Sequence, residues 1–174
     1  MTGRYIVPNT IRFILVLLAQ IFVLNYVNLF GWAAPLVYPF LIILLPISVP
    51  SSIVIMAAFL SGLTVDFFTN TGGIHAASLT FMGFIRKPIL MQLMPQSGYE
   101  KDELPTFKDQ GFGWFMIYSG ILLFIHHFSY FILEAYSFSH FGKTIIRTFL
   151  SGVVSFSLFW IISLAALPQK KKLR

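Results

Sequence analysis

Long apolar stretches, separated by short polar segments, dominate the chain from residue 11 to residue 167. A membrane-spanning helix needs about 20 mostly apolar residues, or somewhat fewer where it packs among other helices. Six stretches approach this length, namely 11–30, 35–48, 51–68, 74–93, 112–134 and 144–167. The pattern therefore predicts an all-α integral membrane protein, in which residues 1–174 form a single bundle of six transmembrane helices.

The second and fourth of these spans are the least regular. The stretch 35–48 is short and bounded by prolines, and the stretch 74–93 is interrupted by Arg86, Lys87 and Pro88. The part of the fourth span before Arg86 gives only about 18 Å of helix, against a hydrocarbon core of about 30 Å. We therefore expect Arg86 and Lys87 to extend toward the membrane surface, with residues 88–94 lying along it.

Composition supports a membrane protein, since 57% of the 174 residues are hydrophobic and only 10% are charged. Soluble domains carry about 25% charged residues. The chain has no cysteine, which excludes disulfides, thiolate metal sites and thiol catalysis. The first apolar run is longer than the apolar core of a signal peptide, so we expect it to be retained as a span.

The basic residues, which give a net charge of +6, predict an orientation. If the N-terminus lies in the cytoplasm, six spans leave only Lys143 and Arg147 outside. The central loop 95–111 and the basic tail 168–174 then lie inside. The cytoplasmic set is Arg4, Arg12, Arg86, Lys87, Lys101, Lys108, Lys170, Lys171, Lys172 and Arg174. These residues do not form a stripe among aromatic side chains, so no nucleic-acid partner is expected, and the lipid bilayer explains them better.

One carboxylate, that of Asp66, lies among apolar residues at the outer end of the third span. Gly62 precedes it by one helical turn on the same face, where a small residue lets another helix approach closely. A turn that ends at Gly73 leads into the fourth span, whose first N–H groups attract an anion. Three alternatives follow: Asp66 is an interfacial charge, it contacts the helix start at Gly73 and His75, or it pairs with Arg147. The second and third make the carboxylate structural rather than catalytic.

The fifth span carries an outer-side polar cluster of His126, His127 and Glu134. Adjacent histidines point about 100° apart on a helix, whereas paired helical metal ligands are normally four residues apart. Hydrogen bonding between helices is therefore expected, with metal binding or proton relay as the weaker alternative. No nucleophile elbow, zinc-protease motif or phosphate loop is present in the sequence. The sequence thus predicts a protein that is not an enzyme and has no cofactor, metal or catalytic residue.

The segment 61–78, SGLTVDFFTNTGGIHAAS, resembles the signature region of the rod shape-determining protein MreD family. That family has a Gly-x-x-x-Asp element at the end of a middle span, followed by a small glycine turn and a helix that starts with small residues. The matching positions are Gly62, Asp66, Gly73, His75, Ala76 and Ala77. Chain size, basic tail and the six-span pattern agree over nearly the whole chain, and the GIHAA form resembles the family's Bacteroidota branch.

The resemblance implies a non-enzymatic scaffold of the cell-elongation machinery in the bacterial inner membrane. The partners it implies are an MreC-like bitopic membrane protein, the enzymes of peptidoglycan synthesis and, indirectly, MreB filaments. The family also resembles, in fold, the substrate-binding subunits of energy-coupling-factor transporters. The alternative function is therefore a substrate-binding membrane subunit of a small-solute, vitamin-type transporter. We would expect two alanines four apart in the first span of such a subunit, and Ala19 is the only alanine there.

Overall fold

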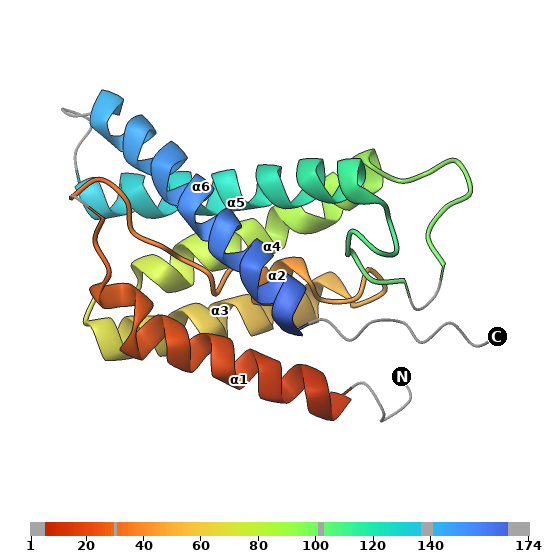
Figure 1. The fold of residues 1–174 in the computed structure, drawn as a ribbon, viewed down its shortest axis with the longest axis horizontal. Coiled ribbons are helices and arrows are strands. Elements are labelled where there is room, and N and C mark those ends of the chain that lie inside the picture. The colour runs from red at the N-terminus through yellow and green to blue at the C-terminus, as the bar shows by residue number, and fades with distance from the viewer. Residues whose placement is uncertain (1–5, 30, 101–102, 137–140, 167–174) are drawn as a thin grey trace.

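The computed structural model describes residues 6–29, 31–100, 103–136 and 141–166, with side chains described between 13 and 161. The described residues form helices and no strand. The elements are α1 (Ile6–Phe22), a short 3-10 turn η1 (Leu24–Tyr26), α2 (Phe40–Ile43), α3 (Ser51–Thr69), α4 (Ile74–Gln92), α5 (Phe112–Ala135) and α6 (Phe141–Ala166). The long helices run back and forth along the bundle, so that α1 begins and α6 ends at the same end of it (Figure 1).

We name the two ends of the bundle after residues that lie there. The Arg86 end contains α2, the start of α3 and the end of α4. The Asp66 end contains the end of α3, the start of α4, the end of α5 and the start of α6.

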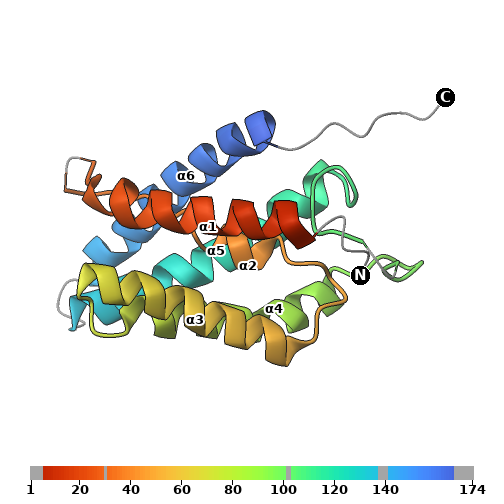
Figure 2. The same ribbon diagram turned by 90° about the horizontal axis from the view of Figure 1, so that it is seen from below.

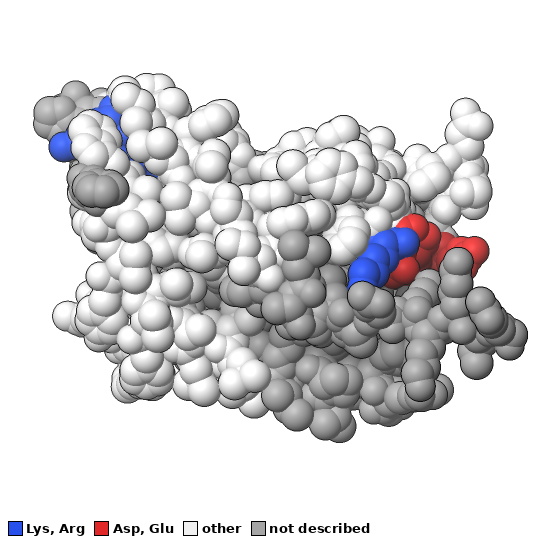
Figure 3. Space-filling model, viewed as in Figure 1, with Lys and Arg blue, Asp and Glu red and all other residues white. Residues whose placement is uncertain are grey.

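Three of the helices are long and apolar enough to cross a membrane: α3, α5 and the part of α6 up to Ile161. Large apolar side chains are exposed along them, including Phe67, Ile117 and Phe149. On the face shown in Figure 3, charged side chains gather toward the two ends of the molecule, and the described surface between them is uncharged. Three apolar helices of this length and a belt of exposed apolar side chains together indicate a membrane protein, because lipid favours such a surface.

The prediction of a helical span over 35–48 is wrong. Only α2 is helical there, and the chain that precedes it has no regular structure. Three prolines explain the difference, because Pro35, Pro39 and Pro46 lack the N–H group that a continuous helix requires. The segment still passes along the bundle, from the end of α1 to the start of α3, between the long helices (Figures 1 and 2).

Other predicted boundaries shift by smaller amounts. The first helix ends at Phe22 rather than at residue 30, and the sixth begins at Phe141 rather than at 144. Helix α4 continues through Pro88 to Gln92, so residues 88–92 do not leave the helix to lie along a surface. The loop 95–111 contains turns only, where it is described. The basic tail 168–174 lies outside the described residues.

The segment 34–46, here called the non-helical pass although it includes the single helical turn α2, lies at the centre of the hydrophobic core. All four residues of α2 are buried, and so are Tyr38 before it and Tyr118 of α5 beside it. Phe40 stacks on Phe159 of α6 with ring centroids 3.6 Å apart. The long helices therefore surround a short, irregular segment whose polar backbone must find partners inside the protein, since lipid offers none.

Candidate functional site

The carboxylate of Asp66 holds α3 against the start of α4. Its Oδ1 accepts hydrogen bonds from the hydroxyl of Thr71 at 2.5 Å and from the N–H of His75 at 3.1 Å. Its Oδ2 accepts the N–H of Ala76 at 2.7 Å. The first N–H groups of a helix have no partner within the helix, and they carry the positive end of its dipole. Asp66, only 4% exposed, therefore acts as a cap supplied by the preceding helix.

The turn between these helices requires residues that tolerate positive φ. Asn70, the residue that follows α3, adopts the left-handed conformation, with φ of 56°. Gly72 and Gly73 follow with φ of 65° and 95°, which glycine adopts without the strain that a Cβ atom imposes. This turn returns the chain within a few residues, so that the start of α4 faces the last turns of α3.

Gly62 allows the two helices to touch. A Cβ atom at this position would lie 2.5 Å from the Cα of Ala76 and 2.6 Å from the carbonyl oxygen of His75. Both atoms belong to the backbone of α4, which cannot give way as a flexible side chain could. The glycine and the carboxylate one turn later thus form one unit, here called the Asp66 corner: Gly62, Asp66, the turn from Thr71 to Gly73 and the first turn of α4.

The ring of His75 connects this corner to the non-helical pass. Its Nδ1 lies 2.9 Å from the hydroxyl of Tyr38, and the same hydroxyl lies 2.8 Å from Nε2 of His126. Tyr38 and His126 are fully buried, and His75 is 2% exposed. A single phenol therefore bridges α4 and α5. Nδ1 of His126 is buried without a hydrogen-bond partner among the described residues.

His127 takes part in a second set of hydrogen bonds that hold the non-helical pass, this time against α6. Its Nδ1 bonds the carbonyl of Leu123 at 2.9 Å, and its Nε2 lies 3.0 Å from the hydroxyl of Ser155 on α6. That hydroxyl also accepts the N–H of Leu36 at 2.8 Å. One turn earlier, Ser151 accepts the N–H of Ala34 at 3.0 Å. Two serines of α6 thus replace the hydrogen bonds that a helical span would have made for itself.

Gln20 of α1 completes the support of this segment. Its side-chain oxygen accepts the N–H of Val37 at 2.7 Å, and its amide nitrogen donates to the carbonyl of Pro35 at 3.1 Å. The residue is fully buried. Sequence reasoning passed over Gln20, Tyr38, Ser151 and Ser155. Two features of the sequence point to such contacts: a lone glutamine in an apolar helix, and two serines one turn apart in the last helix.

Arg86 does not extend toward a surface, contrary to the expectation from sequence. It is 2% exposed, and its Nε donates to the hydroxyl of Tyr118 at 2.8 Å. Its Nη2 donates to the carbonyls of Leu45 and Pro46, which follow α2. The hydroxyl of Tyr118 in turn donates to the carbonyl of Ile43 at 3.0 Å. The phenol therefore satisfies a free carbonyl at the C-terminal end of α2, and the cation satisfies two carbonyls just beyond it.

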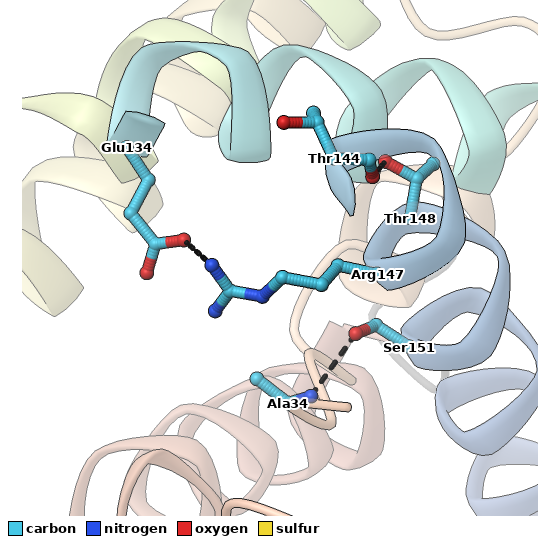
Figure 4. Close-up of polar contacts among 6 residues, drawn as sticks. All are labelled: Ala34, Glu134, Thr144, Arg147, Thr148 and Ser151. Carbon is cyan, nitrogen blue, oxygen red and sulfur yellow. Dashed lines mark hydrogen bonds and ion pairs between the residues drawn. The ribbon is translucent and has the colours of Figure 1, made fainter. Parts of the chain in front are cut away.

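Arg147 forms an ion pair with Glu134 rather than with Asp66. The nitrogen and oxygen are 2.7 Å apart, and the guanidinium lies 4.6 Å from the centre of the Phe131 ring. Figure 4 shows this pair spanning from α5 to α6, one turn from the contact of Ser151 with Ala34. Both side chains are partly exposed, so the pair contributes about 0–1 kcal/mol to stability.

The structure thus divides the residues singled out from the sequence into three groups. Gly62, Asp66, Gly73 and His75 belong to the Asp66 corner. His126 and His127 lie in the core beneath it and bond different neighbours, while Glu134 and Arg147 form a separate pair. No group of three His, Asp or Glu side chains within the described residues is placed to hold a metal ion.

No family model, curated protein or solved structure matches this chain.

Proposed function

We propose that this chain is a non-enzymatic scaffold of the MreD type in a bacterial inner membrane. It binds an MreC-like bitopic membrane protein and, through that partner, helps organise peptidoglycan synthesis along MreB filaments. The observation that carries the proposal is the Asp66 corner. The residues that bear the resemblance to the MreD family, Gly62, Asp66, Gly73 and Ala76, all belong to this one structural unit.

The use of the polar core also supports a scaffold. A catalytic base or nucleophile needs a polar atom that faces a substrate. Here the carboxylate of Asp66 bonds the start of α4, and each ring of His75, His126 and His127 bonds a buried protein group. These residues fix the positions of helices and of the non-helical pass. A protein whose polar core serves to hold its shape is suited to present a defined surface to another membrane protein.

The proposal places both termini in the cytoplasm, with the Arg86 end inside and the Asp66 end outside. The start of α1 and the end of α6 lie at the Arg86 end, as this orientation requires (Figure 1). A reporter that is active only in the periplasm should be silent when fused after Arg174 and active when inserted beside Tyr136, which is 83% exposed. The reverse pattern of activity would contradict the orientation.

Affinity purification in mild detergent tests the function. The full chain, tagged and expressed at its native level, should retain a single-span membrane protein together with enzymes that polymerise or cross-link the cell wall. Recovery of a pair of ATPases and a bound metabolite would instead favour the alternative, a substrate-binding subunit of a small-solute transporter. The control is an unrelated six-helix membrane protein of similar abundance that carries the same tag. Proteins recovered with it as well are retained by the tag or the detergent and not by this chain.

A further inference from the structure

A pocket of about 220 Å³ lies at the Arg86 end, between the start of α3 and the last two turns of α4. It is separate from the Asp66 corner, which lies at the opposite end of both helices. On α4 its lining residues include Gly83, Lys87, Leu90 and Met91, at spacings that place them on one face of the helix, and Met94 lines it just beyond the end of α4. The pocket is therefore a groove with an apolar wall and a lysine at one position along it.

Within the described part of the chain, neither cation of this pocket forms an ion pair with a carboxylate. Arg86 lines it, is 2% exposed, and bonds only neutral acceptors among the described residues: a phenol and two carbonyls. Lys87 lines it too and is exposed. No carboxylate is among the described lining residues, and the nearby carboxylate of Glu103 accepts the N–H of Glu100 in its own loop. A buried charge without a counter-ion is costly, and an anion placed in the pocket would offset that cost.

The surroundings of the pocket place it at the level of a membrane surface. Tyr99 lines it and donates to the carbonyl of Leu90 at 2.7 Å, and Trp114 donates to the carbonyl of Leu93 at 2.8 Å. Tyrosine and tryptophan with their polar atoms bonded in this way are typical of the boundary between lipid and water. Met91 and Met94, 64% and 53% exposed, continue the wall of the pocket toward lipid.

We propose that this pocket binds an anionic phospholipid, with its phosphate beside Lys87 and Arg86 and one acyl chain along Met91 and Met94. The positive charges of Lys87 and Arg86 select an anionic headgroup, and the flexible methionine side chains adapt to the shape of the acyl chain. The site binds lipid whether or not the chain has the partner proposed above, because none of its residues belongs to the Asp66 corner. It anchors the junction of α2, α3 and α4 to the leaflet at the Arg86 end.

Native mass spectrometry of the purified full chain tests this site by titration with phosphatidylglycerol and with phosphatidylcholine of the same chains. We expect phosphatidylglycerol to bind more tightly. Lys87→Gln should weaken its binding about fivefold, the effect of one lysine near a charged lipid surface, whereas Lys87→Arg should retain it. Lys143→Gln is the matched control, since Lys143 is an exposed lysine at the opposite end, over the ring of Trp32.

Equal binding of the two lipids, or an equal loss in Lys87→Gln and Lys143→Gln, would overturn the proposal. Inorganic phosphate and glycerol 3-phosphate distinguish the source of the anion, because they carry the charge without acyl chains. The comparison is a chloride salt at the same ionic strength. If phosphate or glycerol 3-phosphate displaces phosphatidylglycerol and the chloride salt does not, the occupant of the pocket is a soluble phosphate compound and the lipid is excluded.

Discussion

The carboxylate of Asp66 and the backbone N–H of Ala76 are 2.7 Å apart, although the two residues belong to different helices. With the N–H of His75, this contact satisfies two of the groups that a helix start leaves free. The side chain thus does for α4 what an N-terminal cap normally does, but from the helix before it. The contact therefore fixes the relative position of α3 and α4.

Replacing Asp66 should lower the free energy of unfolding, and the decrease should grow with the number of hydrogen-bond acceptors that are lost. Asp66→Leu removes all three hydrogen bonds and leaves two buried N–H groups unpaired, at about 1–3 kcal/mol each. Asp66→Asn keeps one acceptor oxygen, so its loss should be smaller. Thermal unfolding in detergent measures both. Thr64→Val is the control, because Thr64 is exposed on the same helix and its hydroxyl donates only to the carbonyl of Leu60 in that helix. An Asp66→Leu midpoint equal to that of Thr64→Val would show that the carboxylate is only an interfacial charge.

Gly62→Ala should separate α3 from α4. The added Cβ would lie 2.5 Å from a backbone atom of Ala76, so a helix has to shift, at about 1–3 kcal/mol for such overpacking. Gly120→Ala is the matched control, since a Cβ there meets nothing within 4 Å. We expect a lower melting temperature for Gly62→Ala and little change for Gly120→Ala. Equal effects of the two substitutions would mean that the close approach of the helices is not needed.

Ser155→Ala should loosen the non-helical pass. It removes the acceptor of the Leu36 N–H and a partner of His127, leaving a buried donor at a cost of about 1–3 kcal/mol. Faster hydrogen exchange at Leu36, measured by mass spectrometry in detergent, should report the loss. Ser157→Ala serves as the control, because Ser157 is exposed and bonds only the carbonyl of Val153 in its own helix. Unchanged exchange in Ser155→Ala would contradict the assigned role.

The Asp66 contact could be anticipated from the sequence because all its parts lie within the 15 residues from Gly62 to Ala76. A glycine one turn before the acid, a glycine turn and a following helix start are local signals. The sequence could not choose between this contact and an ion pair with Arg147, because the position of α6 is set by distant packing. Glu134, closer to Arg147 along the chain, forms that pair instead.

The non-helical pass could not be anticipated in the same way. Its hydrogen bonds join Leu36 to Ser155, Tyr38 to His75 and His126, and the end of α2 to Arg86. These partners lie far apart in the sequence, and no local pattern specifies them. An apolar run of 14 residues such as 35–48 is compatible with a helix by composition, but its prolines remove the necessary donors. The sequence predicts a surface position for Arg86 for the same reason, because no local pattern shows that its acceptors come from that distant segment.

The central claim is that the Asp66 corner builds the shape that a partner membrane protein recognises. The most direct measurement is the amount of single-span partner captured per folded protein from detergent extracts, for the wild type, Asp66→Leu and Thr64→Val. Only the fraction that runs as a single species on size exclusion is counted, so that loss of folding is not scored as loss of binding. We predict a clear reduction for Asp66→Leu and wild-type capture for Thr64→Val. Full capture by folded Asp66→Leu would contradict the claim.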